Sequence, residues 1–283
     1  MKQVQQDTFD IFYRYISSCS EDREEELLDN WSSTVLSTND YSFESGLLGL
    51  GWLIAFLIEN DYIEGDADEI LEDIDDTVYK LTIREVLEPT TNVTSLLYYS
   101  TYYQQRIQYK SNAPFYRRFA HFECMKLLLE KLNSFLLESS DFTSSSILSD
   151  QIQVVLKYSY LTKTCINEEL VDEAFYTTVE RLLDFFEHQQ NPAKFEDELA
   201  KLYICIRQYE NPHWIDRFDH IWPGTKEEDG VPKSTDSSFW SKVSSAFSQN
   251  RPVSTQDFFL ETDKEKYNIF LYHTNIKPEF FTT

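Results

Sequence analysis

Apolar residues recur every three or four positions over most of the chain between Asp7 and Tyr209. This spacing predicts amphipathic helices with one buried face. Short connections between them favour antiparallel helical hairpins. The predicted helices are Asp7–Ser17, Asp22–Val35, Gly46–Glu59, Asp66–Leu81, a helix that begins at Asn92 or Thr94 and ends at Tyr109, Pro114–Leu137, Ser146–Leu161, Asn167–His188 and Ala193–Tyr209.

Two neighbouring helices differ in their patterns. Residues Leu47–Ile58 are apolar nearly all round, which predicts a helix buried on every side. Residues Asp66–Leu81 carry a single apolar stripe, which predicts an outer helix with one face in water. The stripe consists of Ile70, Ile74, Val78 and Leu81.

The pattern changes near Trp222. Residues 224–256 are rich in Ser, Lys, Asp and Pro and contain one short amphipathic stretch, Phe239–Phe247. The stretch Tyr267–Tyr272 fits either a short strand or the end of a helix. We therefore expect a helical domain over residues 1–223 and a small irregular appendage, packed on it, over residues 224–283.

Composition supports an all-α fold. The 283 residues include only 6 Gly and 8 Pro, whereas average usage is about 7% Gly and about 5% Pro. All-β folds need these residues at their turns, and nucleotide-binding loops need glycine to approach phosphates.

The formal net charge of −24 limits the partners. It repels nucleic acid and anionic membrane surfaces, and the basic clusters that would have to override it are short. They are Tyr116-Arg117-Arg118 and the pair Arg106 and Lys110. We therefore expect a peptide or protein partner, either basic or zwitterionic, and no nucleic acid.

The sequence contains no apolar run long enough for a transmembrane helix and no apolar signal core near residue 1. We therefore expect no membrane insertion and a cytoplasmic location. The cysteines are Cys19, Cys124, Cys165 and Cys205, which are widely spaced. In a reducing compartment they are expected to be free thiols.

Three of the six glycines, Gly46, Gly49 and Gly51, fall within six positions. The spacing of Gly46 and Gly49 predicts that they share one face of a helix. A glycine inside a helix costs about 1 kcal/mol relative to alanine, so either another backbone or a ligand is expected close to this face.

This segment resembles a known family. Residues Phe43–Lys80 are similar to one repeat of the lanthionine synthetase C-like proteins, in the variants found in Bacteroidetes-type peptide systems. The resemblance implies an α/α toroid, incomplete at this length, in which Gly46 and Gly49 open an inner helix and residues 66–80 form the outer one. It also implies a role in peptide maturation or export. Residues Thr94–Ile107 lie where another inner helix is expected, but they contain no glycine.

The resemblance does not extend to the chemistry of the family's enzymes. These enzymes bind zinc through two cysteines and a histidine, with a Cys-His-Gly motif, and this chain has no Cys-His pair. We therefore expect a non-catalytic member that binds a peptide, with no zinc or other cofactor. One alternative is an active zinc-dependent peptide-modifying enzyme, for which the ligands to watch are Cys165, Cys205 and His213. Another is an acidic helical scaffold for a basic protein partner.

Three further groups have spacings that metal binding or proton transfer would need. His213, Asp216 and His220 fall on one face of a helix that Asn211 and Pro212 are expected to start. His121 and Cys124 are three residues apart on another helix. Residues Glu59–Asp76 are strongly acidic, although Gly65 does not match the register of a calcium-binding loop. Ordinary packing or a solvated helix face also explains each of them.

A run of tyrosines in the helix that ends at Tyr109 is the remaining candidate. Its members are Tyr98, Tyr99, Tyr102, Tyr103 and Tyr109. They fit an aromatic groove for a peptide or a sugar, or core packing with a polar rim. The residues predicted to bind a ligand are Gly46, Gly49, Tyr98, Tyr102 and Tyr103.

Overall fold

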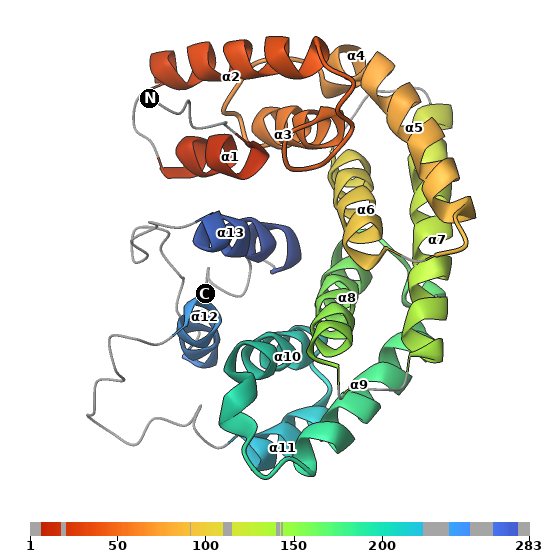
Figure 1. Cartoon of the computed structure of the whole chain (residues 1–283), viewed down its shortest axis with the longest axis vertical. Coiled ribbons are helices and arrows are strands. Elements are labelled where there is room, and N and C mark those ends of the chain that lie inside the picture. Colours follow the sequence, from red (N-terminus) through yellow and green to blue (C-terminus); the bar gives the residue numbers. More distant parts are fainter. Residues whose placement is uncertain are drawn as a thin grey trace. The chain divides into compact units, whose positions relative to one another are not determined.

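The computed structural model describes residues 7–17, 21–90, 92–109, 115–139, 142, 144–222, 238–249 and 263–276. These residues form thirteen α-helices and two short 3-10 helices, and they include no strand (Figure 1). The fold is therefore all-α, as the sequence predicts. The toroidal arrangement of the helices stays a prediction.

The chain divides into two compact units. Unit 1 comprises residues 1–131 and 261–270, and unit 2 comprises residues 132–260 and 271–283. The domain boundary predicted after residue 223 lies outside the described residues, as do 224–237, 250–262 and 277–283 of the predicted appendage. The described parts of that appendage are helical: α12 (Phe239–Ser248) and α13 (Asp263–Asn275), so Tyr267–Tyr272 belongs to a helix.

Unit 1 is built around a helix that is buried nearly all round. Its elements are α1 (Thr8–Ser17), α2 (Glu21–Leu36), α3 (Leu47–Glu59), α4 (Ala67–Ile70), α5 (Glu72–Leu87), α6 (Val93–Gln108) and the first parts of α7 (Phe115–Glu138) and α13. Helix α3 packs against α1, α2, α5 and α6. Only Leu47, Ile54 and Phe56 of its apolar residues are half-buried and the others are buried, which confirms the predicted buried helix.

The predicted helix over residues 66–81 is interrupted at Leu71. The Asp66 carboxylate caps α4 by accepting a hydrogen bond from the Asp68 amide (2.8 Å). Leu71 ends α4, begins α5 and is fully buried, whereas Ile70 is 49% exposed. The prediction that Ile70 belongs to the buried stripe was therefore wrong. The break between α4 and α5 turns Leu71 toward the core instead of Ile70.

Aromatic side chains fill the middle of unit 1. Phe270, from α13, lies with its ring centroid 4.9 Å from Phe9, 5.2 Å from Phe43 and 5.0 Å from Trp52. These rings come from four separate segments of the chain. Their edge-to-face and tilted contacts favour one specific packing of those segments.

Unit 2 comprises the rest of α7, α8 (Ser145–Thr164), α9 (Asp172–Glu187), α10 (Glu196–Tyr209), α11 (Pro212–Ile221), α12 and the end of α13. Helix α10 packs against α8, α11 and α12. The predicted helices over 167–188 and 193–209 each begin with a 3-10 turn, Glu168–Leu170 and Pro192–Phe195. Asn211 caps α11 through the amides of His213 and Trp214, as its sequence predicts.

Candidate functional site

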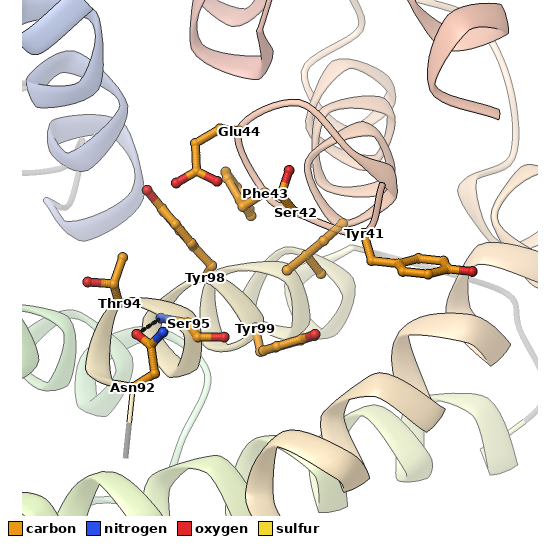
Figure 2. A pocket seen from close by; sticks show the side chains of 10 residues that line it. Tyr41, Ser42, Phe43, Glu44, Asn92, Thr94, Ser95, Tyr98 and Tyr99 are labelled. Atoms are coloured by element: carbon orange, nitrogen blue, oxygen red, sulfur yellow. Dashed lines mark hydrogen bonds between the residues drawn. The ribbon is translucent and has the colours of Figure 1, made fainter. Parts of the chain in front are cut away.

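A pocket of about 220 Å³ lies in unit 1 between the α2–α3 connection and the start of α6 (Figure 2). We call it the tyrosine pocket. One wall comes from residues 41–48 and the other from residues 92–99. Its lining residues are Tyr41, Ser42, Phe43, Glu44, Leu48, Asn92, Thr94, Ser95, Tyr98 and Tyr99.

Glycines allow the first wall to lie where it does. A β-carbon on Gly49 would lie 1.8 Å from the Phe43 carbonyl oxygen and 2.2 Å from Thr8 Oγ1. A β-carbon on Gly46 would lie 2.6 Å from the Asp40 carbonyl oxygen. All three distances are too short for real atoms, so only glycine lets residues 40–44 cross the start of α3. The close neighbour expected from the sequence is the chain's own backbone.

The prediction that Gly46 and Gly49 share a helix face was wrong. Gly46 precedes α3 as its N-cap in an extended conformation (φ −121°, ψ −165°). Helix α3 begins only at Leu47, whose amide donates to the Asp40 carbonyl oxygen (3.0 Å). Neither glycine lines the pocket, and both act by positioning the wall that does.

Asp40 fixes the loop that carries this wall. Its carboxylate accepts hydrogen bonds from the Ser42 amide (2.9 Å) and the Ser45 hydroxyl (2.8 Å). The bond from the Ser42 backbone, followed by that from Ser45, lowers the pKa of Asp40 below its usual value. Thr8 ties the loop to α1, since its hydroxyl donates to the Phe43 carbonyl oxygen (2.6 Å).

The second wall is the first two turns of α6. Asn92 caps this helix by accepting from the Ser95 amide (3.1 Å), so Ser95 and Thr94 present hydroxyl groups at the pocket. One helical turn further, the Tyr98 ring stacks on Phe43 of the opposite wall, with centroids 4.5 Å apart and an interplanar angle of 10°. This stack joins the two walls.

Glu44 is the one charged side chain among the ten lining residues. Figure 2 shows its carboxylate beside the Tyr98 hydroxyl group. Burial, then the charges of Tyr267 and Glu44 and a hydrogen bond to Glu44, raise the pKa of Tyr98 far above its usual range. Burial also raises the pKa of Tyr99, to about 12. The phenols are therefore neutral, and the pocket carries a negative charge.

The structure separates the predicted tyrosines. Tyr98 and Tyr99 line the pocket, whereas Tyr102 and Tyr103 are fully buried and bind the protein's own side chains. The Tyr102 hydroxyl donates to Asp75 Oδ1 (2.5 Å), and the Tyr103 hydroxyl lies 3.0 Å from Thr82 Oγ1. These two tyrosines are therefore core residues and do not line an aromatic groove.

Two other residues considered from the sequence, Arg106 and His121, belong to a buried charge network. Arg106 does not contribute to a basic surface, because its guanidinium pairs with Asp75 (2.8 Å) and Asp68 (2.7 Å). His121 Nε2 lies 3.4 Å from Asp75 Oδ1, in the buried core. Burial opposes ionisation of Asp75, but hydrogen bonds from His121 and Arg106 outweigh it and lower its pKa to about 2.

The remaining metal candidates are dispersed. The side chains of His213, Asp216 and His220 are exposed on α11, while Cys205 is buried and donates to the Val155 carbonyl oxygen (3.5 Å). Burial raises the pKa of Cys165 to about 11. Within the described ranges, no three or more His, Cys, Asp or Glu side chains are grouped so that they could hold a metal ion.

The acidic segment over residues 59–76 has structural partners. Asp66 caps α4, Asp68 and Asp75 pair with Arg106, and Glu72 pairs with Arg117 (2.8 Å). These contacts hold α4 and α5 to α6 and α7.

Comparisons with models of known families, with curated proteins and with solved structures find no match to this chain. The part of the chain that the structure describes contains no helix with an apolar stretch that could span a bilayer.

Several lining residues were not predicted from the sequence. Tyr41, Ser42, Glu44, Thr94 and Ser95 reach the pocket only because the two walls meet in space. The glycines gave a partial signal for the first wall, because Gly46 and Gly49 indicate that another backbone segment packs close to the start of α3. The Asn92 cap likewise indicated where the second wall begins.

Proposed function

We propose that this chain is a non-catalytic peptide-binding protein that anchors a peptide side chain in the tyrosine pocket. The size of the pocket carries the proposal. Pockets that enclose whole small molecules or cofactors occupy about 300–1,000 Å³. The tyrosine pocket, at about 220 Å³, is of a size for one side chain whose backbone stays outside.

The lining chemistry supports a peptide. Aromatic rings provide apolar contact area at low entropic cost, and the hydroxyl groups of Thr94 and Ser95 can pair with polar groups at the rim. The resemblance of residues 43–80 to lanthionine synthetase C-like proteins points the same way, toward a peptide-maturation or export system. Phe43, Glu44 and Leu48 of the first wall belong to that segment.

A substitution that fills the pocket tests the proposal. Thr94 is exposed at the pocket rim, so Thr94→Trp is expected to block the pocket without disturbing the core. Thr34→Trp, at an exposed position of α2, is the matched control. The probe is a set of fluorescein-labelled peptides in a Gly-Ser context that differ only in a central Lys, Arg, Glu, norleucine or Phe.

Anisotropy titrations should show micromolar binding of at least one peptide. Thr94→Trp should weaken that binding by about tenfold or more, a loss of about 1.4 kcal/mol, while Thr34→Trp leaves it unchanged. The absence of binding by every peptide, or equal effects of the two variants, would refute a peptide site in this pocket.

A further inference from the structure

We infer that the tyrosine pocket selects a primary ammonium group, as on a lysine side chain of the bound peptide. This inference rests on the proposed function and adds the class of side chain. It is carried by the charge of the pocket and by the hydrogen-bonding capacity of Glu44.

The charge of the lining has one sign. Glu44 is acidic, none of the ten lining residues is basic, and the neutral phenols of Tyr98 and Tyr99 add no positive charge. The pocket also lies in a chain of net charge −24. An anionic side chain would be repelled there, whereas a cationic one would be attracted.

Glu44 retains free acceptor capacity. A carboxylate has about four lone-pair sites, and the neighbouring Tyr98 hydroxyl, which has a single proton to donate, occupies at most one of them. The Glu44 side chain is exposed, so an incoming ammonium group reaches it without first losing all its water. The Ser42 hydroxyl oxygen lies on the same wall and already accepts from the Ser45 amide (3.3 Å), which leaves one lone pair for an ammonium donor.

The aromatic walls fit the rest of a lysine side chain. Tyr98 and Tyr99 offer ring surface to an alkyl stem, and ring faces also attract cations, whereas the Tyr41 ring is directed away from Glu44 (Figure 2). A compact ammonium with three donors suits separate acceptors on one wall. The planar guanidinium of arginine favours a carboxylate with both oxygens available, and at Glu44 the Tyr98 hydroxyl lies beside them (Figure 2).

Glu44→Gln tests the charge without removing the hydrogen bond. The amide oxygen of glutamine still accepts from Tyr98, so the pocket should keep its shape. Glu64→Gln is the matched control, since Glu64 is exposed in the same unit and does not line the pocket. The control also measures the general attraction of a basic peptide to an acidic protein.

The Lys peptide should bind about tenfold more tightly than the norleucine peptide, which has the same stem without the ammonium. Glu44→Gln should reduce this preference to about twofold or less, and Glu64→Gln should leave it unchanged. Equal binding of the two peptides, tighter binding of the Arg peptide, or equal effects of both glutamine variants would overturn the ammonium assignment.

The failure of this inference is distinguishable from the failure of the proposed function. If the Phe or norleucine peptide binds best and Thr94→Trp abolishes its binding, the pocket anchors a peptide but does not select an ammonium. If Thr94→Trp affects no peptide, the peptide site itself is refuted.

Discussion

Lys157 is a lysine whose side chain lies in the core of unit 2, where burial makes its positive charge unfavourable. It is 2% exposed in unit 2, and its ammonium donates to the Thr274 carbonyl oxygen (3.2 Å) at the end of α13. Gln208 donates to the neighbouring Asn275 carbonyl oxygen (3.0 Å). The two side chains satisfy backbone groups that the last turn of a helix leaves unpaired. Burial nevertheless lowers the pKa of Lys157 to about 7.

Lys157 should make stability depend on pH. Because its pKa is lower in the folded chain than its ordinary value of 10.5, the unfolded chain binds one more proton between about pH 7 and about pH 10. The free energy of unfolding should therefore rise with pH in this window. At pH 6.5 the charged, buried lysine lowers the free energy of unfolding of the unaltered chain, whereas the uncharged methionine of Lys157→Met does not.

Urea unfolding of the unaltered chain and of Lys157→Met checks this dependence. The stability of the unaltered chain, relative to the variant, should rise between about pH 6.5 and about pH 9.5 by on the order of 3 kcal/mol. A difference between the two proteins that does not change with pH would show that Lys157 is fully ionised in the folded chain.

Gly49 and Gly51 provide a graded test of close packing. Around Gly49 the obstacle is the Phe43 backbone, which cannot move without shifting the pocket wall. Around Gly51 the nearest atoms belong to side chains, Ile74 Cγ2 at 2.8 Å and Tyr102 Cε2 at 2.9 Å. Gly49→Ala should destabilise the chain by about 3 kcal/mol or more, and Gly51→Ala by less. Thermal unfolding followed by circular dichroism measures both, and the reverse order would contradict the packing described for residues 40–44.

At the scale of elements, the Asp75–Arg106 pair joins α5 to α6 inside unit 1. The side chain of Arg106 is fully buried and also pairs with Asp68, which lies in α4. Removing Asp75 leaves the buried guanidinium with Asp68 as its remaining ion-pair partner among the described residues, and a buried charge that loses a partner costs more than the pair contributes.

Asp75→Asn should therefore destabilise the chain by about 3–5 kcal/mol. Glu72→Gln, which removes an exposed partner of Arg117, is the control and should cost less than about 1 kcal/mol. Because the pKa of Asp75 is lowered to about 2, its stabilising effect is present above about pH 4 and lost toward pH 2. Chemical unfolding at pH 7 measures both costs, and similar costs would contradict a buried, ionised Asp75.

The helices were predictable and their long-range partners were not. Helical spacing is local, so the pattern located most helices and identified Leu47–Ile58 as a buried helix. Tyr98 and Tyr102 lie four residues apart on α6 and so on the same side of the helix. Tyr98 nevertheless stacks on Phe43 at the pocket, whereas Tyr102 donates to Asp75 in the core. Likewise, Arg106 appears basic in sequence, but it pairs with a carboxylate 31 residues earlier. Partners so far apart in sequence leave no local pattern.

At the scale of the whole molecule, a net charge of −24 over 283 residues produces repulsion between acidic side chains. This repulsion opposes the compact state and is screened by salt. Raising NaCl from about 20 mM to about 500 mM should therefore raise the thermal unfolding midpoint at pH 7. A lower midpoint in high salt would indicate that exposed ion pairs, such as those of Arg217 with Glu180 and Asp184, contribute more than the repulsion.

The central claim, a peptide site at the tyrosine pocket, is tested most directly by nuclear magnetic resonance. The chain would be labelled with ¹⁵N and titrated with the peptide that binds it most tightly in the anisotropy experiment. The account predicts shift changes concentrated in the amides of residues 41–48 and 92–99. Changes concentrated instead at the exposed aromatic residues Phe115, Tyr116 and Phe119 of α7, or in unit 2, would contradict it.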